Sequence, residues 1–240
     1  MQRFLLPAIF LVAILASASA QRPVVPRALP PNAYAPVEDV AGLPRVLLIG
    51  DSISEGYTVP VRKLLQGRAN VHRIPENGGA TKAGVAKIEE WLGDGKWDVI
   101  HFNWGLHDLM FNPESHPDPA QYEKDQLALY EKQLRALTAR LKQTGAKLIW
   151  ASSTPVPEEM SSPRSPSHRS RVVQMYNEVA AKIMAENGVP IDDLNTYVAP
   201  VQDKMQKPHD VHFSVEGSEY LAIKVAEEIA KALPPPHERK

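Results

Sequence analysis

The sequence predicts an α/β fold: a doubly wound, mainly five-stranded parallel sheet with helices on both faces. Two observations lead to this prediction. Short apolar runs alternate along the chain with longer segments of helical periodicity, and this alternation is typical of parallel sheets covered by helices. The chain of 240 residues is also long enough for one substantial core and short for two.

The first twenty residues have the pattern of a secretory signal peptide. The basic Arg3 precedes an apolar stretch over residues 4–15, and the small residues Ala18-Ser19-Ala20 follow. A membrane anchor is the less favoured interpretation, because a spanning helix needs about 20 apolar residues. We expect cleavage after Ala20, no stable membrane span after cleavage, and a secreted or periplasmic protein.

Residues 21–44 contain six prolines. Proline lacks an N–H donor and fixes φ, so this segment is predicted to be an extended lead-in rather than a domain. It either lies against the rest of the protein or tethers it. A single domain is expected over residues 45–235, in which the polar, proline-rich segment 155–170 is a surface loop and a candidate flap.

The first part of this domain contains three expected strands and two helices. The apolar run RVLLIG begins it, and Pro60 interrupts the next helical segment, where we expect it to restart the helix. The second helix presents Val85, Ile88 and Leu92 on one face. In order, these elements are strand 45–50, helix 54–67, strand 70–75, helix 81–93 and strand 97–104.

The second part continues the alternation with three helices and two strands. Its first helix repeats apolar residues every three to four positions, at Leu127, Tyr130, Leu134, Leu137 and Leu141. Gly145 and Gly188 follow the first two helices, as glycine often does at helix ends. In order, these elements are helix 119–143, strand 146–153, helix 168–187, strand 189–195 and helix 215–233.

The composition disfavours several classes of function. The formal net charge is −1, and removal of Arg3 with the signal peptide makes it −2. Such a balance gives no indication of nucleic acid or an anionic membrane as a partner. The chain has no cysteine, which excludes thiolate zinc sites and a cysteine nucleophile and means that the core must stabilise the protein without disulfides.

Polar residues and glycines follow the expected strands. Ligands of doubly wound sheets bind beyond the carboxyl ends of the strands, so these residues are candidates for one site. Four segments have this position: Asp51-Ser52, Asn77-Gly78-Gly79, Trp104 to Asp108, and Ser152 to Pro155.

Ser52 has two interpretations. A hydroxyl between a strand and a helix is a common N-cap, and for Ser52 alone we favour this reading. A nucleophile would also need a base, an orienting acid and oxyanion donors. Of the eight histidines, His107, His209 and His212 are the candidate bases. His212 stands just before the last expected helix, and Ser214 is placed to cap that helix. His209 and His212 form an H-x-x-H pattern, but no second cluster of ligands accompanies it, so a metal site is disfavoured.

These segments, taken in chain order, resemble the blocks of the SGNH hydrolases, also called the GDSL esterase/lipase superfamily. The resemblance covers roughly residues 45–233 and implies a flavodoxin-like, three-layer fold. The blocks are Gly50-Asp51-Ser52-Ile53 for GDSL, Asn77 to Thr81 with Gly79 as the oxyanion glycine, Gly105-Leu106-His107-Asp108 for G-x-N-D, and HDVHFS with His212 as the histidine.

The chain departs from the family in the third block. His107 stands where the family has asparagine. A neutral imidazole can donate one N–H to an oxyanion, so the role can survive the exchange. Alternatively, Asn103 is the side-chain donor, or the oxyanion hole rests on the main-chain N–H groups of Gly79 and Ser52.

A second departure lies in the fifth block. The family has an aspartate three positions before the histidine, whereas this chain has His209 there and Asp210 only two positions before His212. A shifted turn would bring the Asp210 carboxylate to Nδ1 of His212. Otherwise a main-chain carbonyl orients His212, or the site works as a serine–histidine dyad.

The resemblance implies a serine esterase, and the predicted signal peptide adds that it is exported; we expect no cofactor and no metal. In this esterase, Ser52 attacks an ester carbonyl, His212 transfers the proton, and Asp210 orients the imidazole. Asp51 and Asp108 are expected to anchor loops by accepting main-chain N–H bonds. The favoured substrate is a short acyl ester, such as an acetyl group, on a carbohydrate, because the chain has no long apolar lid and only 7% aromatic residues.

Other functions remain open for the same residues. A lysophospholipase or thioesterase, or an O-acyltransferase in which a bound alcohol replaces water, would use the same nucleophile. A catalytically silent glycan-binding module is the alternative outside the enzymes. The partner in each case is a small-molecule or glycan ester, or a glycan.

Overall fold

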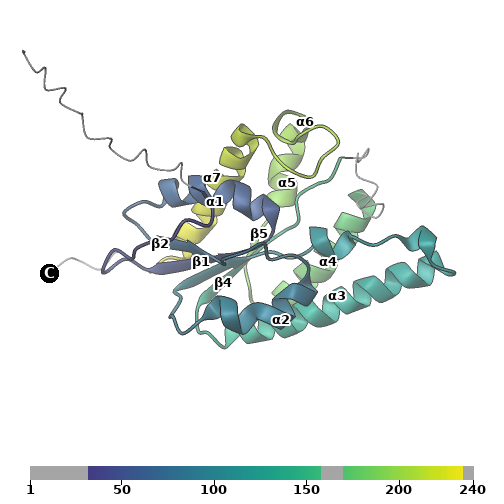
Figure 1. Cartoon of the computed structure of the whole chain (residues 1–240), viewed down its shortest axis with the longest axis horizontal. Helices are drawn as coiled ribbons and strands as arrows, with labels where there is room; N and C mark the ends of the chain where they lie inside the picture. The colour runs from purple at the N-terminus through teal and green to yellow at the C-terminus, as the bar shows by residue number, and fades with distance from the viewer. Residues whose placement is uncertain (1–31, 158–169, 235–240) are drawn as a thin grey trace, which may run out of the picture. The chain divides into compact units, whose positions relative to one another are not determined.

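A computed structural model describes residues 32–157 and 170–234 of the chain (Figure 1). The predicted signal peptide, residues 21–31 of the lead-in and most of the predicted loop at 155–170 lie outside these residues. Five parallel strands form one sheet in the order β2-β1-β3-β4-β5. The strands are β1 (Arg45–Ile49), β2 (Asn70–Arg73), β3 (Val99–Phe102), β4 (Lys147–Ala151) and β5 (Ile191–Asp192).

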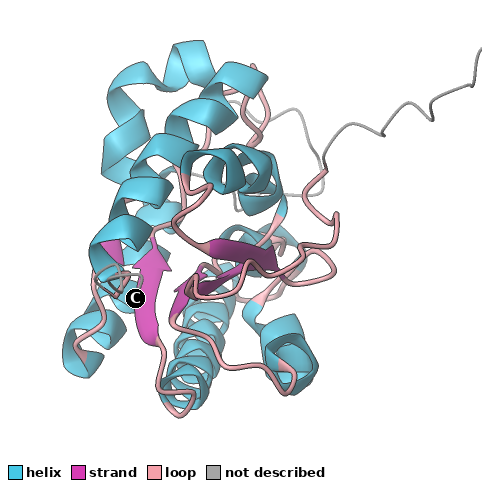
Figure 2. Ribbon diagram, turned by 90° about the vertical axis from the view of Figure 1, so that its left-hand side faces the viewer, coloured by secondary structure: helices cyan, strands magenta, loops and turns pink. Residues whose placement is uncertain are grey.

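Helices cover both faces of this sheet, as Figures 1 and 2 show. On one face α1 (Ser52–Leu64) packs along α7 (Val215–Ala232). The other face carries α2 (Thr81–Leu92), α3 (Pro119–Lys142) and α4 (Ser170–Asn187). The predicted doubly wound, three-layer α/β fold is therefore confirmed.

The register of the central strands brings their carboxyl ends to one edge. Ile49 of β1 lies opposite Phe102 of β3, and Phe102 lies opposite Trp150 of β4. All three side chains are buried in the core. The residues that leave the sheet after them therefore emerge at the same level, where ligands of such folds bind.

Several element boundaries differ from the prediction. Pro60 lies inside the continuous helix α1 and does not restart it. Ile88 and Leu92 lie on the buried face of α2 as predicted, but Val85 is 48% exposed, and Gly84 and Trp91 complete that face instead. The strand predicted at 189–195 is only the two residues of β5, since Asp193 caps a short helix by accepting the N–H of Thr196.

Short helices that the sequence did not predict fill the chain between β5 and α7 and after β3. They are α5 (Leu194–Val198) and α6 (Gln202–Met205), with single 3₁₀ turns at Leu106–Leu109, Pro113–Ser115 and Ala199–Val201.

The described part of the lead-in lies against the rest of the protein. The Asn70 side chain accepts the N–H of Val40 at 2.9 Å and donates to its carbonyl at 3.0 Å. Asp39 pairs with His72 at 2.6 Å, and the Tyr34 hydroxyl donates to Glu55 of α1. Residues 32–44 are thus bound to β2 and α1.

Candidate active site

Ser52 is the first residue of α1, and its neighbour Asp51 caps the helix. The Asp51 carboxylate accepts the main-chain N–H of Ile53 at 3.0 Å. The interpretation of Ser52 as the N-cap is therefore wrong, and its hydroxyl is free for another contact. The Ser52 N–H belongs to the first turn, whose N–H groups have no acceptor within the helix.

A chain of hydrogen bonds joins Ser52, His212 and Asp210. Ser52 Oγ lies 2.8 Å from His212 Nε2, and His212 Nδ1 lies 2.7 Å from Asp210 Oδ1. The same Asp210 oxygen accepts the main-chain N–H of His212 at 3.1 Å. A spacing of two residues therefore suffices for the carboxylate to reach the imidazole.

The environment keeps Asp210 ionised. Partial burial raises the pKa of its carboxyl, but the main-chain N–H and the imidazole of His212 lower it more, so the pKa lies below the ordinary value. A carboxylate beside Nδ1 favours a proton on that nitrogen, which leaves Nε2 as the acceptor toward Ser52.

The turn that carries His212 is fixed on several sides. The Lys207 N–H donates to the His212 carbonyl at 2.8 Å, which closes the turn. The buried Gln206 side chain donates to the Val211 carbonyl at 2.8 Å. Ser214 caps α7 by accepting the N–H of Gly217, as predicted from the sequence.

The four predicted oxyanion donors differ in what they bind. The Gly79 N–H donates to the Asn77 side chain at 2.9 Å. The Asn103 amide is buried and donates to the Ala151 carbonyl at 2.7 Å. Among residues 32–157 and 170–234, the His107 imidazole has no hydrogen-bond partner. Of the predicted donors, the His107 imidazole and the Ser52 N–H therefore have no hydrogen-bond acceptor among the described residues.

Asp108 connects the loops that carry Gly79 and His107. Its carboxyl group accepts the N–H of Thr81 at 3.0 Å and 3.1 Å and also contacts the Thr81 hydroxyl. The anchoring roles predicted for Asp51 and Asp108 are therefore confirmed. Burial raises the pKa of the Asp108 carboxyl and outweighs the hydrogen bonds from Thr81, which lower it. The resulting pKa is about 7.

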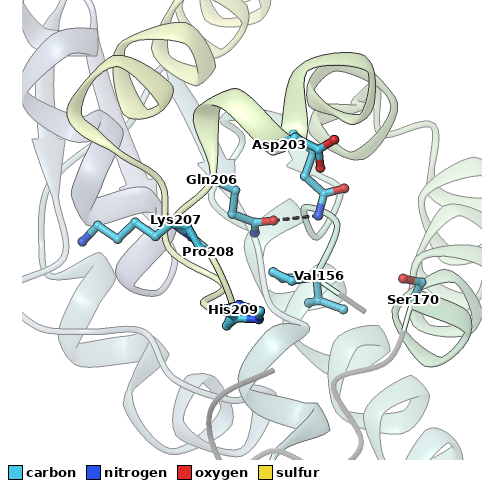
Figure 3. Close-up of a pocket in the computed structure, with 9 residues that line it drawn as sticks. Val156, Ser170, Asp203, Gln206, Lys207, Pro208 and His209 are labelled. Carbon is cyan, nitrogen blue, oxygen red and sulfur yellow. Dashed lines mark hydrogen bonds between the residues drawn. The ribbon is translucent and has the colours of Figure 1, made fainter. Parts of the chain in front are cut away.

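A cavity of about 410 Å³ lies beside Ser52 and His212. Its lining is polar and apolar in equal parts, with Glu55, Lys207 and Ser218 among the polar residues. A separate cavity of about 550 Å³ contains neither Ser52 nor His212 and is lined by residues such as Val156, Asp203 and His209 (Figure 3). In Figure 3 the Lys207 side chain points away from that larger cavity.

The described residues contain neither a cluster of metal ligands nor a membrane-spanning helix. No group of three or more His, Asp or Glu residues there is arranged to hold a metal ion. In the same residues, every helix is too short or too polar to cross a membrane.

The chain belongs to the GDSL-like lipase/acylhydrolase family, whose model matches residues 48–220. This membership makes it an ester-bond hydrolase of the SGNH superfamily, in agreement with the resemblance seen in the sequence. No curated protein matched the chain.

Solved structures share the fold at low sequence identity. A lipase/acylhydrolase from Enterococcus faecalis has a TM-score of 0.66 and 19% identity, over 82% of this chain and 100% of that one. The acetylxylan esterase Axe2 from Geobacillus stearothermophilus has a TM-score of 0.59 and 22% identity, over 78% and 94%. The acetyl xylan esterase AlAXEase has a TM-score of 0.60 and 16% identity, over 77% and 99%.

Three residues around Ser52 were not predicted from the sequence. Glu55 and Lys207 line its cavity, and Arg73 lies buried behind its turn. Glu55 is three positions after Ser52 on the same helix, so helical spacing alone would have placed it nearby. Nothing in the pattern distinguishes Lys207 or Arg73 from other basic residues of the chain.

Replacement of Asp108 tests the raised pKa through the pH dependence of stability. A carboxyl group with a pKa of about 7 in the folded state and 3.8 when unfolded stabilises the fold most below pH 4. This contribution is lost as the pH rises through 7. The melting temperature of wild type should therefore fall relative to Asp108→Asn between pH 4 and 8. Parallel curves for the two proteins would contradict the assignment.

Proposed function

We propose that this chain is an exported serine esterase that hydrolyses a short acyl ester, with acetyl on a carbohydrate as the preferred class. The observation that supports it most is the continuous hydrogen-bond chain from Ser52 through His212 to Asp210. Ser52 attacks the ester carbonyl while His212 Nε2 accepts its proton. The Asp210 carboxylate orients the ring and stabilises the imidazolium.

The rest of the reaction follows from the same groups. Collapse of the tetrahedral intermediate breaks the bond to the alcohol, and His212 returns the proton to the leaving oxygen. Water then attacks the acyl-enzyme with His212 as the base, which releases the acid and restores Ser52.

For the oxyanion hole we propose the Ser52 N–H and the His107 imidazole as primary donors. Both lack a protein acceptor in the described residues, whereas Asn103 is bound to the Ala151 carbonyl. The Gly79 N–H can serve as a further oxyanion donor only after it releases the Asn77 side-chain oxygen. That exchange costs the hydrogen bond between Gly79 and Asn77.

The proposed substrate class rests on the cavity and on the neighbours. Glu55, Lys207 and Ser218 offer hydrogen bonds to hydroxyl groups of an alcohol, and Ile53 and Phe213 are the large apolar side chains among the described lining residues, enough for a short acyl group. Two of the structural neighbours are named acetylxylan esterases. Serine-to-alanine and aspartate-to-alanine variants of Axe2 are described as catalytic mutants.

We further propose the organisation of the exported protein. The signal peptide at residues 1–20 is removed, the lead-in of residues 21–44 follows, and one domain at residues 45–235 contains the proposed site. N-terminal sequencing of the protein recovered outside the cytoplasm should begin at Gln21.

Labelling with a fluorophosphonate tests the nucleophile. The reagent reacts with activated serines, so wild type should be modified at Ser52, as shown by peptide mapping. Ser52→Ala should abolish the modification, and His212→Ala should reduce its rate by about 10³-fold or more, since the general base is lost. A folded wild-type protein that stays unlabelled would favour the silent glycan-binding module.

Replacement of His107 tests the oxyanion donor. With p-nitrophenyl acetate, His107→Ala should lower kcat by about 10²- to 10³-fold, the usual effect of losing one such donor. His107→Asn restores the family residue and should retain most of the activity. Asn103→Ala is the comparison. It should lower the melting temperature, because the buried hydrogen bond to the Ala151 carbonyl is lost, and it should lower kcat less than His107→Ala does. A larger loss of kcat in Asn103→Ala would assign the donor role to Asn103.

A matched series of esters tests the substrate class. Acetylated xylo-oligosaccharides should have a higher kcat/KM than p-nitrophenyl octanoate, acyl-CoA thioesters or lysophospholipids. Preference for one of the last two would support the thioesterase or lysophospholipase alternative. Adding a sugar alcohol to the acetyl-ester assay distinguishes hydrolysis from transfer: acetylated sugar, rather than acetate, as the main product would indicate an acyltransferase.

A further inference from the structure

Arg73, the last residue of β2, is a buried cation behind the turn that carries Ser52. Its side chain has no exposed surface. Nη2 donates to the main-chain carbonyls of Gly50 at 2.9 Å and Asp51 at 3.2 Å, and Nη1 donates to the hydroxyl of Ser54. One guanidinium group therefore holds residues on both sides of Ser52.

Main-chain and hydroxyl dipoles, rather than a close carboxylate, provide most of the partners of this charge. Glu55 Oε1 lies 3.8 Å from Nη2, beyond hydrogen-bond distance. The same oxygen accepts the Asn77 amide at 2.8 Å and the Tyr34 hydroxyl. Within the described residues Arg73 Nε has no partner. Burial of a cation in this way is unfavourable, so stability alone gives a weak reason for it.

The position of the charge suits the proposed reaction. Ser52 begins α1, and the N-terminus of a helix carries a partial positive charge. The Arg73 guanidinium adds a full charge behind the same turn. Negative charge develops at Ser52 Oγ during attack and then on the carbonyl oxygen, and fixed positive groups stabilise charge that develops near them.

We propose that Arg73 is a positioning residue for the nucleophile. Its guanidinium fixes the direction of the Ser52 N–H and Oγ through the neighbouring carbonyls, and its charge favours the transition state. The inference rests on the proposed function, since it requires Ser52 to react. Arg73 itself has no exposed surface and does not touch the substrate.

Two substitutions and a matched control test this role. Arg73→Met removes the charge and the hydrogen bonds, whereas Arg73→Lys keeps the charge and loses the forked geometry. Arg62→Met is the control, because Arg62 also connects α1 to β2, by donating to the Val71 carbonyl at 3.0 Å. Arg62 lies near the far end of α1 from Ser52.

The measurements are kcat and KM for p-nitrophenyl acetate and the rate constant of fluorophosphonate labelling. Arg73→Met should lower kcat and the labelling rate by about 10²-fold with KM within about twofold, as expected for a displaced nucleophile. Arg73→Lys should lose about tenfold. Arg62→Met should lower the melting temperature and leave kcat within about twofold of wild type.

Each other outcome overturns the inference. Wild-type kcat in either folded Arg73 variant, a change confined to KM, or an equal loss of kcat in Arg62→Met would mean that Arg73 is only structural. If Arg73→Met does not fold, Arg73→Lys decides alone. Absence of labelling in wild type would overturn the proposed function as well, whereas labelled wild type with unaffected Arg73 variants overturns this inference alone.

Discussion

The register of the three central strands is the constraint on which the rest of the structure depends. Ile49, Phe102 and Trp150 lie side by side in the buried core. A shift of one residue in any strand would turn its side chains to the opposite face of the sheet, against different helices, so the packing of helices on both faces fixes the register. The residues that follow therefore leave the sheet at one level, and the candidate site assembles at that edge.

At this edge, each residue of the first turn has a separate task. Gly50 allows the close approach of α1, since a Cβ there would lie 2.8 Å from Ser54 Oγ. Asp51 caps the helix, because its carboxylate accepts the N–H of Ile53, which has no acceptor within the helix. Because the neighbouring carboxylate is the cap, the Ser52 hydroxyl is left to face His212. A serine that capped its own helix would have its oxygen turned toward the N–H groups of the first turn.

The layers of the fold and this turn were predictable from the sequence, because burial produces periodic apolar patterns and polar residues interrupt them where strands end. Two features around the candidate site were not predictable. These are the hydrogen bond from the Gly79 N–H to the Asn77 side chain and the burial of Arg73, which both depend on three-dimensional packing. The short helices α5 and α6 were missed because four or five residues are too few to show a period.

The departure at Asp210 has a physical explanation in the local turn. Asp210 Oδ1 accepts both the ring and the main-chain N–H of His212, and Lys207 closes the same turn from the other side. The orientation of the imidazole is therefore set within six residues of chain. Only its contact with Ser52, 160 positions earlier, depends on the tertiary fold. Close packing of α1 on α7 provides that contact: a Cβ at Gly56 would lie 2.8 Å from Ser218 Oγ.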